Sequence, residues 1–366
     1  MKKIRVGILF GGRSEEHEVS LQSAKNVIEA MDKNKYDIVL IGIDRKGHWY
    51  LNESSHFLLH AEDPKHISLK HGNIELAMIP GSAANQIVPV SGDKLIGGLD
   101  VIFPVLHGPF GEDGTVQGLL RMADIPFVGA DVLGSAVSMD KDVMKRLLNQ
   151  AAIPQAKFIS LNYYERNSIK FETVESYTGI PCFVKPANLG SSVGISKVHR
   201  QEEFEPALSE AFKFDEKIVI EQFIEGREIE CSVLGNENPI ASLPGEVIPT
   251  HEFYSYEAKY LDQQGAKFQI PVHLPEKVVR KIQETAIKAF KVLNCEGMAR
   301  VDFFLKGAEE IYLNEINTIP GFTRISMYPK LWEASGIPYP ELLDRLIQLA
   351  LERHERKRRL INEREK

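Results

Sequence analysis

Cysteine is scarce in this chain of 366 residues, and its three copies, Cys182, Cys231 and Cys295, stand singly inside apolar segments. Neither their number nor their spacing is that of a disulfide framework or a cysteine-ligated metal site. The thiols are therefore predicted to stay reduced, as in a cytoplasmic protein.

Long apolar runs and an excess of positive charge are also missing. No apolar run approaches the length of a membrane-spanning helix. Ile4 to Phe10 follows two lysines, as in a signal peptide, but Gly11 to Glu16 ends the run and no small-residue cleavage site follows. The net charge of -7 argues against general nucleic-acid binding, although local basic sites are compatible with it. We expect neither a membrane nor a nucleic acid among the partners.

The first third of the chain alternates predicted strands with helices. Strands are expected at 4–10, 37–43, 101–106 and 127–129, and helices at 19–31 and 115–123. Such alternation predicts a mostly parallel sheet covered by helices. Residues 50–98 are too irregular to interpret, and a helix is expected from Asp140 to Asn149.

After Pro154 the pattern changes to short strands and hairpins. Strands are expected at 182–185, 194–198, 218–223 and 227–234, and helices at 202–212, 276–293 and 339–354. The polar and aromatic segment from Thr250 to Lys267 has no clear period, which is typical of a functional lid. The expected fold is α/β and α+β in three parts, residues 1–135, 136–235 and 236–366, with a mobile loop at 249–270.

The stretch from Met298 to Thr323 contains the densest group of polar side chains. Arg300 and Asp302 are two residues apart in a predicted strand and therefore share a face. A second predicted strand, residues 310–317, places Leu313, Glu315 and Asn317 on one face. Antiparallel pairing of the two strands would bring Asp302, Glu315 and Asn317 together.

Two carboxylates and an amide carbonyl are ligands that suit Mg²⁺, and Mg²⁺ in turn implies a nucleotide. The alternative is that these are ordinary polar side chains of a half-solvated antiparallel sheet. Pro320 and Gly321 follow, and a backbone N–H at such a glycine beside Arg300 is an arrangement that holds an oxyanion.

Several other residues suit phosphate or ligand binding. The loop with Gly190, Ser191 and Ser192 has the composition of a phosphate cradle, or of a plain hairpin turn. Lys185 ends an apolar strand and needs an anion. Lys141 starts a helix and could bind phosphate likewise, although its position taken alone favours a solvated lysine in the first turn.

Two residues follow predicted parallel strands, where ligands bind in open sheets. Glu16 is one of them, although an acidic residue at a helix start also interacts favourably with the helix dipole. The other is His107, which could equally be structural.

Taken together and in this order, the motifs resemble those of D-alanine:D-alanine ligases, which belong to the ATP-grasp superfamily. The residues that carry the resemblance are Gly11-Gly12, Glu16 to Ser20, His107-Gly108, Met139-Asp140-Lys141, Val184-Lys185-Pro186, Gly190 to Gly194, Glu257 to Tyr260, Arg300-Val301-Asp302, Asn314 to Thr318 and Pro320 to Thr323. The resemblance implies an ATP-grasp fold: an N-terminal Rossmann-like parallel sheet, a small central α+β domain, and a C-terminal α+β domain with an antiparallel sheet.

The resemblance also implies roles for individual residues. ATP binding is implied for Lys141, Lys185, Ser192, Glu221, Phe223, Ile224, Glu228 and Lys259, and magnesium binding for Asp302, Glu315 and Asn317. Catalysis is implied for Glu16, Ser191, Tyr260, Arg300 and Gly321, and substrate binding for Glu16, His107, Arg300, Ser326 and Met327.

The implied reaction joins two D-alanine molecules through an acyl phosphate, for peptidoglycan synthesis. Its cofactors would be ATP and two Mg²⁺ ions, with Mn²⁺ as the alternative metal and room for a monovalent cation, and the implied assembly is a homodimer. Tyr260 favours a dipeptide product, whereas Gln222 and Arg324 depart from the family pattern. The alternatives are a ligase that uses D-lactate or D-serine as acceptor, and a non-catalytic nucleotide-binding sensor.

Overall fold

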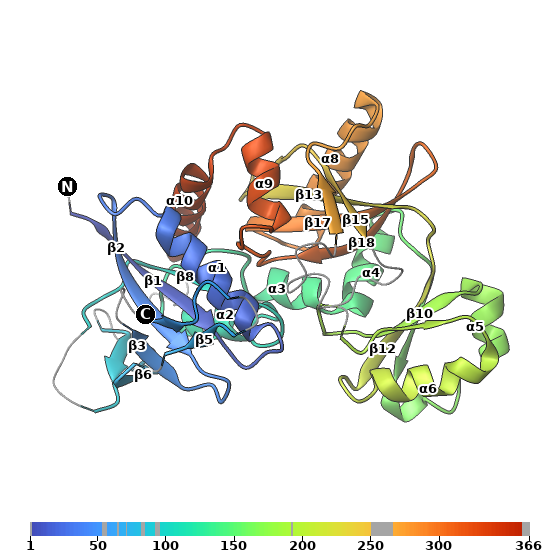
Figure 1. Cartoon of the computed structure of the whole chain (residues 1–366), viewed down its shortest axis with the longest axis horizontal. Helices are drawn as coiled ribbons and strands as arrows, with labels where there is room; N and C mark the ends of the chain where they lie inside the picture. Colours follow the sequence, from blue (N-terminus) through green and yellow to red (C-terminus); the bar gives the residue numbers. More distant parts are fainter. Residues whose placement is uncertain are drawn as a thin grey trace, which may run out of the picture.

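The computed structural model describes residues 2–52, 57–63, 66–70, 72–81, 85–91, 96–191, 193–249 and 266–360. These residues form three lobes, each built on its own sheet (Figure 1). The first sheet lies at the lower left of Figure 1, the second with its two helices at the lower right, and the third above them. No helix in the described ranges is both long and apolar enough to cross a membrane.

The first sheet has the strand order β7-β6-β3-β2-β1-β8. Its central strands β1, β2 and β8 are parallel, as the sequence predicts, whereas β3, β6 and β7 from the irregular segment add an antiparallel edge. The elements of this lobe are β1 (Ile4–Gly11), α1 (His17–Ala30), β2 (Tyr36–Ile43), β3 (Trp49–Asn52), β4 (Leu58–Leu59), β5 (Ser68–Leu69), β6 (Ile74–Met78), β7 (Ile87–Pro89), β8 (Val101–Val105), α2 (Thr115–Met122) and α3 (Val132–Met139).

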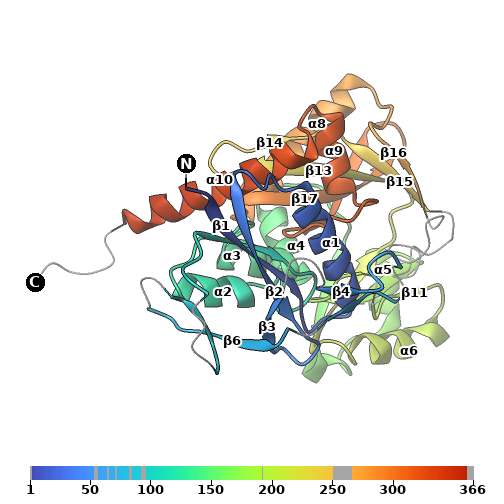
Figure 2. The same cartoon turned by 60° about the vertical axis from the view of Figure 1, so that its left-hand side comes forward.

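The predicted strand at residues 127–129 is wrong. Phe127 makes only an isolated parallel bridge to Ile102. The carbonyls of Phe127 and Gly129 instead accept hydrogen bonds from the buried Arg353, whose guanidinium also lies 4.5 Å from the Phe127 ring centre. A side chain from the last helix, α10 (Tyr339–Arg358), thus takes the place of a neighbouring strand. The views in Figures 1 and 2 both place α10 beside α1, and apolar residues of the two helices share one core.

The middle sheet is antiparallel with the strand order β11-β10-β12-β9. Apolar residues of one face pack against α5 and α6, so the alternate residues, among them Lys185 and Glu221, point to the opposite face. The elements here are α4 (Lys141–Gln150), β9 (Phe158–Asn162), a 3-10 turn (Tyr163–Glu165), α5 (Phe171–Thr178), β10 (Cys182–Pro186), β11 (Ser196–Val198), α6 (Gln201–Ala211) and β12 (Lys217–Gln222).

The third sheet is also antiparallel, with the strand order β16-β15-β13-β17-β18 and with β14 paired to β13. Helix α8 packs on its apolar face. The elements are β13 (Arg227–Gly235), β14 (Ile240–Ala241), β15 (Gly245–Pro249), β16 (Ala266–Gln269), α8 (Glu276–Val292), β17 (Gly297–Lys306), β18 (Glu310–Asn317) and α9 (Met327–Ala334), followed by α10.

Three details of this sheet differ from expectation. Strand β13, which the division by sequence assigns to the middle segment, pairs with β17 in the third sheet. Ala266–Gln269 forms a strand where a loop was predicted to continue. Leu313 does not share a face with Glu315: a bulge between Asp302/Phe303 and their partners turns Leu313 into the core.

Candidate active site

One cavity of about 450 Å³ collects every predicted site residue that the structure describes. These residues come from all three lobes: Glu16, His107, Lys141, Lys185, Ser191, Glu221, Phe223, Ile224, Glu228, Arg300, Asp302, Glu315, Asn317, Gly321, Ser326 and Met327. Ser192, Lys259 and Tyr260 lie outside the described residues. Residues that are 310 positions apart in the chain, such as Glu16 and Ser326, therefore line the same space.

One wall of the cavity, formed by β17 and β18, carries an excess of carboxylates and is named the acidic wall. The predicted antiparallel pairing is confirmed, with Asp302 opposite Glu315 and Arg300 opposite Asn317. Arg300 binds Asp302 through Nε (2.8 Å) and Nη2 (2.7 Å), and Nε also lies 2.9 Å from Oε2 of Glu230. Glu230 was missed by the sequence analysis, although its alternation with Glu228 along one predicted strand was an available signal.

The oxygen ligands on this wall fit a divalent cation such as Mg²⁺. Asp302 and Glu315 are paired in register, and the Asn317 amide donates a hydrogen bond of 3.0 Å to Asp302. Within the described ranges no three His, Cys, Asp or Glu side chains form a metal cluster. Two carboxylates and one amide leave coordination positions for substrate oxygens and water, as Mg²⁺ commonly requires.

The opposite wall, on α4, β10 and β12, carries an excess of cations and is named the lysine wall. Glu221 is buried and forms ion pairs with Lys185 and with Lys145, which is completely buried. Burial alone would raise the pKa of Glu221, but the two lysines outweigh it and lower the pKa to about 2. The sequence analysis missed Lys145, which lies one helical turn after Lys141 and so on the same helix face.

Lys141 projects from the start of α4 into the cavity. Its Nζ donates to the Leu189 carbonyl at 2.5 Å, and its backbone N–H donates to Ala187 at 3.0 Å. Burial lowers the pKa of Lys141, partly offset by Glu315 across the cavity. Lys141 and Glu315 line the same cavity, and the charge of Glu315 acts on Lys141, so the two walls lie close to each other.

Apolar side chains close one end of the cavity. The rings of Phe183 and Phe223 meet edge to face at 5.9 Å, and Lys197 Nζ lies 4.3 Å from the Phe223 ring centre. Gln222, the residue that departs from the family pattern, accepts a hydrogen bond from the backbone N–H of Lys157 at 3.3 Å. This end suits a flat heterocycle stacked between apolar groups.

Glu16 and Ser191 meet at the other end. Ser191, with its backbone in the left-handed region (φ 53°), donates a hydrogen bond to the buried Glu16 carboxylate. Glycines leave room for that carboxylate, because a Cβ added at Gly108 would lie 3.0 Å from Glu16 Oε2. The result is a small acidic corner that fits an ammonium group.

His107 lines the cavity and also holds a neighbouring segment of the chain in place. Its Nδ1 lies 3.0 Å from the Ile319 carbonyl and its Nε2 lies 3.2 Å from Ser23 Oγ. Burial lowers the pKa of His107, which favours the neutral ring that donates from Nδ1 to Ile319. His107 thus connects the end of β8 to the segment that contains Gly321.

Glu112 is a third residue that the sequence analysis missed. It lines the cavity, and its Oε2 accepts a hydrogen bond of 2.8 Å from the Gly108 N–H. Burial, followed by the charge of Glu16, raises the pKa of Glu112 to about 8. Burial and the nearby Glu16 carboxylate thus favour the protonated form of Glu112 more than in an ordinary exposed carboxyl group.

The segment from Gly321 to Ser326 is fixed by local contacts. Ser326 Oγ accepts a hydrogen bond from the Thr323 N–H at 2.9 Å, and a Cβ added at Gly321 would lie only 2.7 Å from the same oxygen. The buried Phe322 ring contacts Phe103 and Tyr328. Arg324 is exposed next to this segment.

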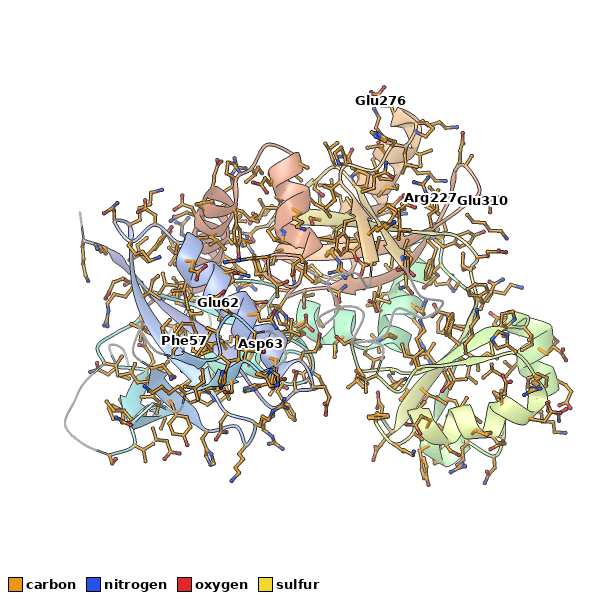
Figure 3. All side chains as sticks on the ribbon, in the orientation of Figure 1. Phe57, Glu62, Asp63, Arg227, Glu276 and Glu310 are labelled. Carbon is orange, nitrogen blue, oxygen red and sulfur yellow. The ribbon has the colours of Figure 1, made fainter. Side chains whose placement is uncertain are left out.

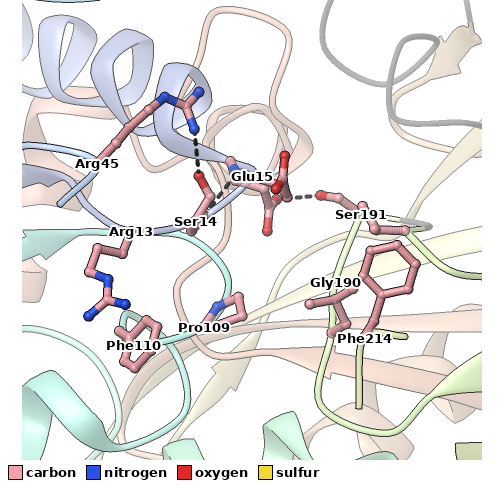
Figure 4. A pocket seen from close by; sticks show the side chains of 12 residues that line it. Arg13, Ser14, Glu15, Arg45, Pro109, Phe110, Gly190, Ser191 and Phe214 are labelled. Atoms are coloured by element: carbon pink, nitrogen blue, oxygen red, sulfur yellow. Dashed lines mark hydrogen bonds between the residues drawn. The ribbon is translucent and has the colours of Figure 1, made fainter. Parts of the chain in front are cut away.

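A smaller cavity of about 390 Å³ adjoins the main cavity and is lined in part by Ser14, Phe110 and Ser191 (Figure 4). It shares Glu16, Leu189, Gly190 and Ser191 with the main cavity. Arg13 lies over the Phe110 ring at 5.2 Å on its outer side. The hydrogen bond between Glu16 and Ser191 thus forms part of the partition between the two cavities.

Known proteins match this chain over nearly its whole length. Residues 5–130 match the family model described as D-ala D-ala ligase N-terminus, and residues 147–348 match D-ala D-ala ligase C-terminus. The D-alanine--D-alanine ligase of Oceanobacillus iheyensis is 58% identical over 98% of each chain, and D-alanine--D-alanine ligase A of Escherichia coli K12 is 54% identical over 97% of each.

Solved structures agree with the sequence matches. The D-alanine-D-alanine ligase from Coxiella burnetii superposes with a TM-score of 0.85 at 40% identity, covering 98% of this chain and 97% of that one. The VanG D-Ala:D-Ser ligase from Enterococcus faecalis gives 0.84 at 36% identity, covering 95% and 100%. With both family models matched in order and with such identity over its whole length, the chain belongs to the D-alanine:D-alanine ligase family.

Proposed function

We propose that this protein joins two D-alanine molecules into D-alanyl-D-alanine for peptidoglycan synthesis, converting ATP to ADP and phosphate. The observation that carries the proposal is the single cavity in which an acidic wall faces a lysine wall, with an ammonium-binding corner at one end. Identity above 50% to ligases of this specificity over almost the whole chain supports the same reaction.

In the first step, a carboxylate oxygen of one D-alanine attacks the γ-phosphorus of ATP, and the bond from that phosphorus to the bridging oxygen breaks to release ADP. Glu16, held by Ser191, binds the ammonium group of this first substrate. Lys141 and Lys185 contact the phosphates, and Lys259 is proposed to contact the γ-phosphate. Such transfers depend mainly on positioning and on neutralising phosphoryl charge.

In the second step, the amine of the other D-alanine attacks the carbonyl carbon of the acyl phosphate. Arg300 and the Gly321 N–H stabilise the oxyanion that develops on the carbonyl oxygen. The intermediate then collapses, the carbon–oxygen bond to phosphate breaks, and the amine loses a proton. Ser326 and the Met327 backbone bind the carboxylate of the second substrate.

Asp302, Glu315 and Asn317 would hold the metal, for which we propose two Mg²⁺ ions. A bound divalent cation neutralises phosphate charge and orients the phosphoryl oxygens. Phe223, Ile224, Glu221 and Glu228 form the proposed pocket for adenine and ribose. For Tyr260, outside the described residues, we propose a catalytic role together with Glu16 and Ser191.

We also propose three domains divided near residues 135 and 235, where β13, although it precedes the second boundary, adds its strand to the third sheet. We further propose a cytoplasmic location, where ATP is available, and a homodimer. Exposed apolar side chains on α2 and α3, among them Met122 and Leu133, are compatible with a subunit contact in the N-terminal lobe. Light scattering of the purified protein measures the assembly directly.

The test of function is ADP release with MgATP and D-alanine, with the product identified by mass. Control reactions contain L-alanine, no amino acid, or D-alanine with D-lactate or D-serine. Dipeptide formation from D-alanine alone is the expected result. A mixed product in preference to the dipeptide would assign another acceptor, and ATP binding without turnover would indicate a nucleotide-binding sensor.

A further inference from the structure

A buried lysine to which the proposed mechanism gives no role lies behind the lysine wall. Lys145 Nζ pairs with Oε1 of Glu221, while Lys185 pairs with Oε2 of the same carboxylate. Lys185 and Glu221 line the main cavity, and Lys145 is not among the described residues that do. The two lysines therefore bind one carboxylate from opposite sides, and only one of them is next to the ligand.

The fold fixes Lys145 in this position. Its helix, α4, starts against the loop after β10, where Lys141 N–H donates to Ala187, and one turn later Lys145 reaches β12. The Nζ also lies 5.7 Å from the ring centre of Phe158 on β9, the strand next to β12. Lys145 is 0% exposed, so water cannot solvate its charge.

The proposed nucleotide site, on which this inference rests, gives Lys185 two competing anions. A nucleotide phosphate draws Lys185 away from Glu221, and a buried carboxylate left without a cation is strongly unfavourable. We propose that Lys145 is a positioning residue that keeps Glu221 ionised and in place, so that Lys185 is free to bind phosphate. The carboxylate then keeps one cation in both states of the site.

We expect removal of Lys145 to weaken the binding of ATP more than the binding of D-alanine. Lys145→Met is expected to raise the KM for ATP roughly 10–100-fold, as loss of a supporting partner commonly does, with a smaller change in kcat and in the KM for D-alanine. Without Lys145, Lys185 stays on Glu221. Arg146→Met is the matched control on the next residue of α4, because Arg146 is largely exposed and pairs with Asp142; its KM for ATP should stay within about twofold of wild type.

A double variant separates charge compensation from packing. If Lys145 acts through the charge of Glu221, Lys145→Met combined with Glu221→Gln should bind MgATP at least roughly fivefold more tightly than Lys145→Met alone. A double variant that binds no better, or a Lys145→Met protein whose KM values for ATP and D-alanine rise equally, would overturn the proposal.

Proton uptake gives an independent readout. The charged groups around Glu221 are Lys141 and Lys145 from α4 and Lys185 from β10, with Glu315 of β18 acting on the α4 lysines. In Lys145→Met, ATP binding removes the remaining ion-pair partner of Glu221, which then takes up a proton. Calorimetry in buffers of different ionisation enthalpy should show this extra uptake, and affinity should fall with rising pH more steeply than in wild type. Equal uptake in both proteins would contradict the inference.

Two further outcomes are decisive. If Lys145→Met does not fold, recovery of folded, MgATP-binding protein in the double variant supports the proposal, and failure of the double variant overturns it. All binding measurements use MgATP without D-alanine. If wild type binds MgATP but makes no dipeptide, the proposed reaction fails while the test of Lys145 still stands.

Discussion

The two walls of the main cavity use charge in opposite ways. On the lysine wall, Glu221 lies between Lys145 and Lys185, with Lys141 nearby, so cations outnumber anions and the pairs are almost fully buried. On the acidic wall, a single Arg300 serves both Asp302 and Glu230, with Glu315 alongside, and these ion-paired side chains retain 13–20% of their exposure. Neither wall is neutral by itself.

This difference indicates which part of the ligand each wall binds. A polyphosphate is bound by cations, and its metal ion is bound by carboxylates. The lysine wall supplies the surplus positive charge, and the acidic wall supplies the surplus negative charge. The ion pairs of the lysine wall are the more deeply buried. The acidic wall keeps somewhat more exposure, as suits a cation that keeps some of its waters.

The largest expected effect comes from the acidic wall. Asp302→Asn should lower kcat/KM roughly 10³-fold, since a metal supplies several kcal/mol of transition-state stabilisation. The Mg²⁺ dependence of ADP release should shift to higher concentration. Glu310→Gln is the control on the same strand pair, because Glu310 lies at the outer end of the sheet near Arg227 (Figure 3) and should leave both quantities unchanged.

The lysine wall should respond to nucleotide and not to metal. Lys141→Met is expected to lower kcat/KM for ATP roughly 10–100-fold, the value of one or two charged hydrogen bonds. The exposed Lys213→Met serves as its control. The comparison between the walls fails if Lys141→Met shifts the Mg²⁺ titration as far as Asp302→Asn does.

Glu16 tests the corner that belongs to neither wall. Glu16→Gln removes the charge that binds the ammonium group, so the KM of the first D-alanine should rise roughly tenfold while the KM for ATP stays unchanged. Steady-state kinetics with both substrates varied gives both values. Glu18→Gln is the neighbouring control, since Glu18 binds Arg45 instead (2.6 and 2.7 Å). A parallel rise in the KM for ATP would contradict a role confined to D-alanine.

The smallest expected effect concerns stability. The pKa of Glu112 is about 8 in the folded protein against an ordinary value of 4.5, so between these pH values the folded state keeps a proton that the unfolded chain has lost. The free energy of unfolding should therefore fall as pH rises through this window, by up to about 1.4 kcal/mol for each pH unit. Urea denaturation at several pH values should give a flatter dependence for Glu112→Gln.

Glu221 provides the contrast within the same experiment. Its pKa is lowered to about 2, so its contribution to stability is complete above pH 4.5 and is lost only as the pH falls toward 2. Titration of Glu221 itself should therefore contribute nothing to the slope between pH 5 and 8. An identical slope in wild type and Glu112→Gln would show that another group titrates there.

Local patterns predicted most of the elements that carry the site. The alternation of Arg300 and Asp302 with apolar residues is enough to place both on one face, and the capping residue Asp140 marks the start of α4. Pairing of β17 with β18 follows from their short connection. These predictions depend on neighbours in sequence, where periodicity is informative.

The missed features depend on partners far away in sequence. The predicted strand at Phe127 is replaced by contacts with Arg353, 226 residues later. Lys145 looks like a solvated helix residue until β12 brings Glu221 to it, 76 positions further on. Leu313 was assigned to the wrong face because a bulge changes the alternation without any glycine or proline to mark it.

The bulge in β18 affects which insertions and deletions the proposed metal site tolerates. One extra residue, in effect Asn314, stands between Leu313 and Glu315, so Phe303 pairs with Leu313 in the core while the adjacent Asp302 pairs with Glu315 on the cavity face. Deleting Asn314 would remove the bulge and leave these pairs in a regular ladder. Deleting a residue elsewhere in β18 would instead shift the register by one position and exchange its faces. The proposed metal site thus depends on the residue count of this strand. Substitutions at its non-ligand positions should be tolerated more readily than single-residue insertions or deletions away from Asn314, which are expected to abolish the site.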